Sequence, residues 1–226
     1  MVKQKSKGYV IFSVVICAAI MSIVDGIVQP PYAVKSAMKV VLFLLVPMFY
    51  FGMYQKDWKQ LRGLFVPDKR ELGIALALGA GVYGVILGGY LLLTRIYDIS
   101  DLVLKLTADN GVSAENFVFV SIYISLVNSM LEEFFFRGFA FLTLKGMTSR
   151  QFAYGFSAVI FALYHYGMMA AGSIWISLLA LVVLVIGGYL FNWLNERSGN
   201  IITSWLVHMC ANLAINTVGF MIFGLI

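Results

Sequence analysis

Seven long stretches of mostly apolar residues restrict this chain to a fold built of membrane-embedded helices. A helix that crosses the hydrocarbon core of a bilayer needs about 20 such residues. Hydrocarbon offers no water to bond backbone groups, so only helices and closed barrels span it. The seven stretches cover roughly residues 8–28, 34–54, 72–96, 116–144, 151–170, 173–194 and 200–225.

Composition supports this interpretation. The chain of 226 residues is 61% hydrophobic and only 12% charged, whereas soluble domains carry about 25% charged residues. Almost no sequence is left over for a soluble domain. We therefore predict an all-α, polytopic bundle around a polar cavity, forming a single membrane domain over residues 1–226. It has seven transmembrane helices, or eight if the last stretch is broken near Gly219.

Lysine and arginine concentrate in alternate loops, which predicts the orientation. One set comprises Lys3, Lys5, Lys7, Lys56, Lys59, Arg62, Lys69, Arg70, Lys145, Arg150 and Arg197. The opposite loops carry Lys35 and Lys39, and then mainly Asp98, Asp101, Asp109 and Glu115 with Arg95 and Lys105. We expect an uncleaved first span in the cell membrane, with the N-terminus in the cytoplasm and the C-terminus outside. The net charge of +5 is then explained by the lysines and arginines that keep loops on the cytoplasmic side. We expect the lipid bilayer, not nucleic acid, as a partner.

Ionisable residues inside the apolar stretches indicate a functional site. Glu132 and Glu133 lie in the fourth stretch, and the only two histidines, His165 and His208, lie in the fifth and seventh. Asn212 follows His208 by four residues. Such groups are costly at membrane depth and mark function by default.

Helical spacing gives the two glutamates different expected roles. Glu133 and Arg137 are four residues apart in the favourable order for an ion pair, so we expect a structural pair. Glu132 has no opposite charge at helical spacing. We expect it to face a cavity and to exchange protons during catalysis.

The two histidine helices leave several interpretations open. Phe161 lies one turn before His165, where it either fixes the ring or is simply core. His208 and Asn212 either bind helices together or supply two donors to one oxygen, as an oxyanion site requires. Glu132, His165 and His208 are also a plausible three-ligand zinc set. No cofactor is certain, and the residues do not decide between metal-bound water and water held by Glu and His alone.

Three short motifs together resemble one family. They are Glu132-Glu-Phe-Phe-Phe-Arg137, Phe161-Ala-Leu-Tyr-His165 and His208-Met-Cys-Ala-Asn212, each on a separate predicted span. They look like the Glu-Glu-x-x-x-Arg, Phe-x-x-x-His and His-x-x-x-Asn motifs of the CAAX protease and bacteriocin-processing family, also called Abi. The similarity covers about residues 116–216. Members of this family include the type II CAAX prenyl endopeptidase.

The resemblance implies an intramembrane endopeptidase acting on a membrane-associated protein or peptide. It assigns Glu132 as the base that activates water and His165 as its assistant. His208 and Asn212 would bind the oxyanion, with Glu133 and Arg137 as supporting groups. Many members are called metalloproteases, although a metal-free mechanism is also argued. Two rivals stay open: a non-catalytic bacteriocin-immunity or partner-binding protein, and a proton-coupled transporter, for which we detect no internal repeat.

Overall fold

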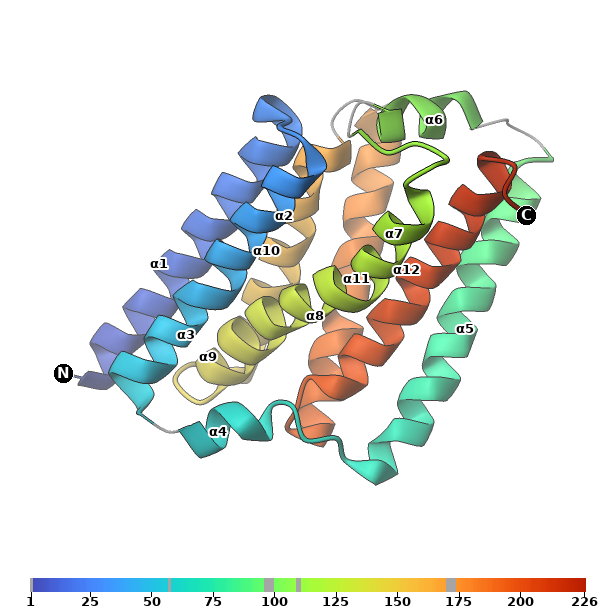
Figure 1. Ribbon diagram of the computed structural model, residues 1–226. Helices are drawn as coiled ribbons and strands as arrows, with labels where there is room; N and C mark the ends of the chain where they lie inside the picture. The colour runs from blue at the N-terminus through green and yellow to red at the C-terminus, as the bar shows by residue number, and fades with distance from the viewer. Residues whose placement is uncertain (1, 57, 96–99, 109–110, 170–173) are drawn as a thin grey trace.

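Every regular element that the structure describes is a helix (Figure 1). The structure is a computed structural model, and it describes residues 2–56, 58–95, 100–108, 111–169 and 174–226. The predicted all-α membrane bundle is confirmed, because six of its helices are long and apolar enough to cross a membrane.

Each of the seven predicted stretches contains a long helical segment within the described residues, and several include wider π-helical turns, labelled η. The first stretch is α1 (Val2–Ile23) with η1 (Val24–Val28), and the third is α5 (Lys69–Leu93). The second joins α2 (Tyr32–Val40), η2 (Val41–Leu45), α3 (Val46–Tyr50) and η3 (Phe51–Gln55). The fourth joins α7 (Phe117–Ile122), η4 (Tyr123–Asn128), α8 (Ser129–Glu132), η5 (Glu133–Leu142) and α9 (Thr143–Lys145). The last three are α10 (Arg150–Met169), α11 (Ile174–Ser198) and α12 (Ile202–Ile222), and the short helices α4 (Trp58–Gly63) and α6 (Ser100–Ala108) lie in connections.

Helix α10 is the predicted span that does not count among the six. Its 20 residues would extend about 30 Å, enough for the hydrocarbon core. However, it carries Arg150, Gln151, Tyr164 and His165, and it packs against α1, α11 and η5. The face of a helix that packs against protein tolerates polar residues that lipid would reject. The alternative of an eighth helix is wrong, because α12 continues through Gly219 without a break.

A proline explains one irregularity in the second span. Pro47 has no backbone N–H, and its ring clashes with the carbonyl group four residues earlier. That carbonyl belongs to Phe43, within the π-helical turn η2. The wider turn accommodates the proline, and the span continues from Tyr32 to Gln55.

Close backbone contact joins the first span to α10. A side-chain carbon at Gly167 would lie 2.1 Å from the carbonyl oxygen of Ser22, and one at Gly26 would lie 3.0 Å from Gly167. Only glycine permits this approach. Because Asp25 and His165 are near these glycines in sequence, the contact brings both side chains to the same cavity.

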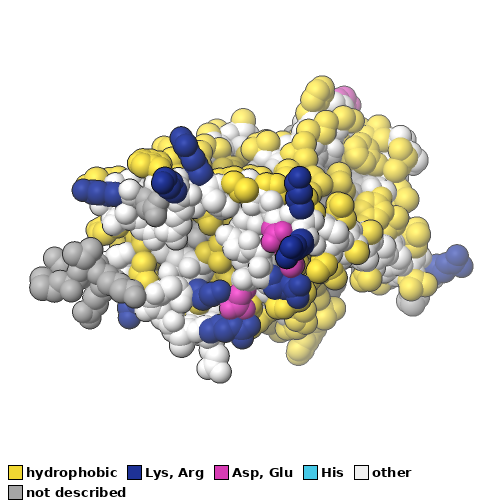
Figure 2. Space-filling view, turned by 90° about the horizontal axis from the view of Figure 1, so that it is seen from below, with side chains coloured by type: hydrophobic (Ala, Val, Ile, Leu, Met, Phe, Trp, Pro, Cys, Tyr) yellow, Lys and Arg dark blue, Asp and Glu magenta, His cyan; other side chains and the backbone are white. Residues whose placement is uncertain are grey.

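The basic loops gather at one end of the bundle. The N-terminus, α4, the α9–α10 turn and the α11–α12 turn lie together at the lower end in Figure 1, and Figure 2 shows lysine and arginine side chains over this face. Lys35 and Lys39 do not belong to an opposite loop as expected, because both are buried in α2. Four of the charged residues expected in the opposite loops cannot be placed. Asp98 and Asp109 lie outside the described residues, as do the side chains of Asp101 and Lys105.

Candidate active site

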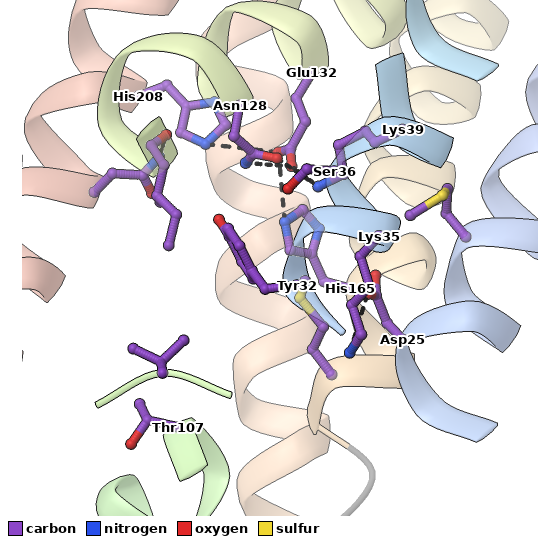
Figure 3. A pocket seen from close by; sticks show the side chains of 15 residues that line it. Asp25, Tyr32, Lys35, Ser36, Lys39, Thr107, Asn128, Glu132, His165 and His208 are labelled. Atoms are coloured by element: carbon purple, nitrogen blue, oxygen red, sulfur yellow. Dashed lines mark hydrogen bonds and ion pairs between the residues drawn. The ribbon is translucent and has the colours of Figure 1, made fainter. Parts of the chain in front are cut away.

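A cavity of about 330 Å³ lies between the first, second, fourth, fifth and seventh spans. Its lining includes all four residues predicted for the reaction centre: Glu132, His165, His208 and Asn212. Figure 3 shows Glu132 and the two imidazole rings turned toward one another. Segments that are far apart in the sequence therefore place these polar groups around one space.

The two oxygens of the Glu132 carboxylate have different environments. Oε1 accepts hydrogen bonds from Lys39 Nζ at 3.1 Å, Asn128 Nδ2 at 2.9 Å and Tyr164 Oη at 3.1 Å. Oε2 is buried and has no hydrogen-bond partner among the described residues. It lies 3.6 Å from His165 Nε2 and 3.8 Å from His208 Nε2. One oxygen is anchored, and the other faces the two imidazoles.

His165 is oriented by the backbone of its own helix. Its Nδ1 lies 2.7 Å from the carbonyl oxygen of Phe161. A carbonyl can only accept, so Nδ1 carries the hydrogen, and Nε2 of the neutral ring has a lone pair directed at Glu132. The Phe161 ring also packs edge-on against the imidazole, with 4.6 Å between centroids. Phe161 is therefore both a core residue and an orienting residue for His165.

His208 lies between the two glutamates. Its Nδ1 contacts Glu133 Oε1 at 2.9 Å, while Nε2 points toward Glu132. The expected pair of Glu133 and Arg137 is present at 3.4 Å, and neither side chain is exposed. The Arg137 guanidinium also stacks over the Phe161 ring at 4.0 Å. Three buried side chains are thus in contact one after the other: the Arg137 guanidinium, the Glu133 carboxylate and the His208 ring.

Asn212 and Asn216 both lie on α12 but have different surroundings. The Asn212 amide lines the cavity and donates to the carbonyl oxygen of Ile124 at 3.1 Å. Asn216 donates to the Ser121 carbonyl and the Ser125 hydroxyl, which ties α12 to the fourth span. The polar stripe on this helix therefore has a packing part and a cavity-facing part.

Lys39, Asn128 and Tyr164 complete the surroundings of Glu132. The expectation that Glu132 lacks an opposite charge holds along its own helix but is wrong in three dimensions, because α2 supplies the Lys39 ammonium. A signal was available in the sequence. Lys35 and Lys39 are one helical turn apart inside an apolar stretch, where a charge marks function as surely as a glutamate does.

The zinc set of Glu132, His165 and His208 stays a prediction. Both histidines use Nδ1 to contact an acceptor, as metal-binding histidines do. Yet no group of three or more His, Cys, Asp or Glu within the described ranges could hold a metal ion. A lysine ammonium already contacts the Glu132 carboxylate, at 3.1 Å.

Comparison with known proteins agrees with the geometry. The sequence model of the family described as "Type II CAAX prenyl endopeptidase Rce1-like" matches residues 114–214, a range that contains all three motifs. No curated protein and no solved structure matches the chain. The match supports an intramembrane protease of the CAAX type in general terms and confirms the resemblance seen in the motifs. Residues 114–214 are therefore similar to the Rce1-like family, and the match is consistent with the CAAX protease and bacteriocin-processing family.

Proposed function

We propose that this protein is an intramembrane peptidase that hydrolyses a peptide bond with a water activated by Glu132 and His165. One observation carries the proposal: Glu132 Oε2 is the uncommitted oxygen of an otherwise anchored carboxylate, and it faces the Nε2 atoms of both imidazoles. A water bound at this point would meet two proton acceptors, the carboxylate oxygen and His165 Nε2.

The reaction begins when this water loses a proton to the Glu132 and His165 pair. The resulting hydroxide attacks the carbonyl carbon of the scissile bond and forms a tetrahedral intermediate with a negatively charged oxygen. Collapse of the intermediate breaks the C–N bond, and Glu132 returns the proton to the leaving amine. The products are a carboxylic acid and an amine, so atoms and charge balance.

In this proposal His208 and Asn212 stabilise the oxyanion. One N–H of the Asn212 amide donates to Ile124, which leaves the second N–H available to the cavity. His208 donates from Nε2 when the ring carries both protons. The Glu133 carboxylate lies 2.9 Å from Nδ1 and accepts its hydrogen, which orients the ring. Glu133 and Arg137 act in this proposal by supporting His208.

The substrate we propose is a protein or peptide that is itself held at the membrane. The cavity lies within a bundle whose outer surface is apolar, so a substrate anchored in the bilayer reaches it without crossing bulk water. We also propose that the basic end shown in Figure 2 faces the cytoplasm, following the positive-inside rule. The N-terminus is then cytoplasmic, and the C-terminus lies outside the cell membrane.

The peptidase can be tested before its substrate is identified. Purified wild-type protein and Glu132→Gln are reconstituted in liposomes with membrane proteins of the source cells, and new peptide termini are identified by mass spectrometry. A quenched fluorescent peptide with a prenylated cysteine three residues before its C-terminus serves as a defined probe. Glu196→Gln is the matched control, because Glu196 is also ion-paired but lies at the basic end.

We expect termini that appear with wild type and with Glu196→Gln but not with Glu132→Gln. Identical termini in all three reactions would refute the peptidase and favour a partner-binding or immunity role. Proton flux that depends on Glu132, without new termini, would favour the transporter. Elemental analysis of the active protein tests the zinc set at the same time.

A further inference from the structure

We infer that Lys39 is a positioning residue for the reaction, and that it holds the Glu132 carboxylate so that Oε2 is the reacting oxygen. The inference rests on the proposed peptidase function. Lys39 lies on α2, outside residues 114–214, so the matched domain does not itself contain this charge. The first spans would thus supply part of the active centre as well as enclosing it.

The contacts of Lys39 form a closed set around one oxygen. Nζ donates to Asn128 Oδ1 at 2.6 Å and to Glu132 Oε1 at 3.1 Å. Asn128 Nδ2 donates to the same Oε1 at 2.9 Å. The Asn128 amide is thereby fixed at both ends, because its oxygen accepts from Lys39 and its nitrogen donates to Glu132. Figure 3 shows the three side chains meeting at this point.

Tyr164 closes the third side. Its hydroxyl donates to Oε1 at 3.1 Å, and its ring centroid lies 5.1 Å from Lys39 Nζ. With donors on three sides, rotation of the carboxylate would break several hydrogen bonds at once. The geometry therefore keeps Oε1 bonded and presents Oε2 to the histidines.

The charge of Lys39 matters as well as its position. Glu132 is almost fully buried, and burial disfavours an ionised carboxylate unless an opposite charge is close. A general base must be ionised to accept a proton. The ammonium at 3.1 Å meets this need. Lys35, one turn earlier, contacts Asp25 at 3.8 Å, and only Lys39 is within 4 Å of the Glu132 carboxylate among the described lysines.

Restoring the charge chemically separates positioning from packing. Lys39→Cys is alkylated with 2-bromoethylamine, which rebuilds a side chain of lysine length with a terminal ammonium, or with bromopropane, which builds a neutral chain of similar size. The wild type, with its own Cys17 and Cys210, is treated in parallel as the control. Turnover is measured at a cleavage site found in the liposome experiment, and the melting temperature is recorded for each protein.

We expect Lys39→Cys to lower kcat by about 100-fold with little change in KM, within the range of general acid–base effects. The aminoethyl form regains most of kcat, and the propyl form does not. Equal recovery with both reagents, or no recovery with either at a wild-type melting temperature, would overturn the positioning role. A wild-type kcat in Lys39→Cys, with Glu132→Gln inactive, would also overturn the positioning role. The proposed peptidase function would then stand without a role for Lys39.

A second variant covers the case in which Lys39→Cys does not fold. Asn128→Leu keeps a similar volume but removes the bridge between Lys39 and Glu132. A lower kcat at unchanged KM supports the inference, and a wild-type kcat contradicts it. Activity in Glu132→Gln would instead remove the proposed function, and this inference with it.

Discussion

Two lysine–glutamate pairs of almost equal length lie in very different parts of the molecule. Lys39 and Glu132 are 3.1 Å apart inside the cavity, and Lys145 and Glu196 are 3.2 Å apart at the basic end. The side chains of the first pair are 11% and 2% exposed, and those of the second are 35% and 20% exposed. Water competes for the second pair, whereas burial largely shields the first pair from bulk water.

The number of donors does not distinguish the two carboxylates. Glu196 accepts from Arg150 and Tyr154 in addition to its pairing with Lys145, and both of its oxygens are engaged. Glu132 has three donors on Oε1 and none on Oε2 among the residues that the structure describes. A carboxylate with one uncommitted oxygen is available for chemistry, and a fully engaged one is not.

The largest expected effect is on catalysis. His165→Ala removes the imidazole that faces Glu132 Oε2 and should lower kcat by about 10²–10⁴-fold, as loss of a general acid–base group does. Glu196→Gln, at the other pair, should leave kcat near wild type. The kcat of both variants is measured on one identified substrate. Similar losses of kcat in His165→Ala and Glu196→Gln would contradict the prediction.

The next effect is on stability. Arg137→Met leaves Glu133 buried without its cation and should reduce the free energy of unfolding by about 3–5 kcal/mol. Arg150→Met removes an exposed partner of Glu196, and Glu196 still has Lys145 and Tyr154. Its melting temperature should stay close to wild type. The unfolding of both variants is measured in the same detergent. A larger loss of stability in Arg150→Met than in Arg137→Met would contradict the prediction.

A smaller effect is expected from backbone packing near the cavity. Gly167→Ala places a carbon 2.1 Å from the Ser22 carbonyl oxygen and should cost about 1–3 kcal/mol, as overpacking does. Gly187→Ala is the matched control, because nothing lies within 4 Å of the added carbon. Melting temperatures distinguish the two, and an equally stable Gly167→Ala would show that the spans can separate there.

The smallest effect is that of salt. The contribution of an exposed ion pair is typically about 0–1 kcal/mol and is screened as ionic strength rises. The stability difference between wild type and Glu196→Gln should therefore shrink in high salt. The difference between wild type and Arg137→Met should not change. Equal salt dependence for both would mean that water reaches the Glu133 pair.

Most of the fold follows from apolar stretches alone. Each of the seven predicted stretches contains a long helical segment within the described residues, because backbone groups in hydrocarbon must bond within their own segment. The π-helical turns were not predicted, since hydropathy contains no information on the number of residues per turn. The short helices α4 and α6 were missed for a related reason, because they lie in connections between the apolar stretches.

The site was predictable where its residues form motifs and not where they meet only in space. Glu132, His165, His208 and Asn212 line one cavity, as expected. Lys39 was missed because its partner is 93 residues away, and helical spacing reports only neighbours within one helix. Tyr164 was missed for the same reason, since it gains its meaning from a contact with Glu132 across 32 residues of sequence.

The buried lysines of α2 also affect how the protein enters the membrane. A lysine opposes insertion by about 2.5–3.5 kcal/mol at the centre of a membrane helix. Lys35 and Lys39 lie in the first third of the second span, Tyr32–Gln55, where the cost is smaller. Lys39 meets Glu132 only after a further 93 residues have been synthesised. Stable insertion of the second span is therefore linked to the arrival of the fourth. A nascent or truncated chain that ends before Glu132 would hold this ammonium without the carboxylate that it pairs with in the folded protein.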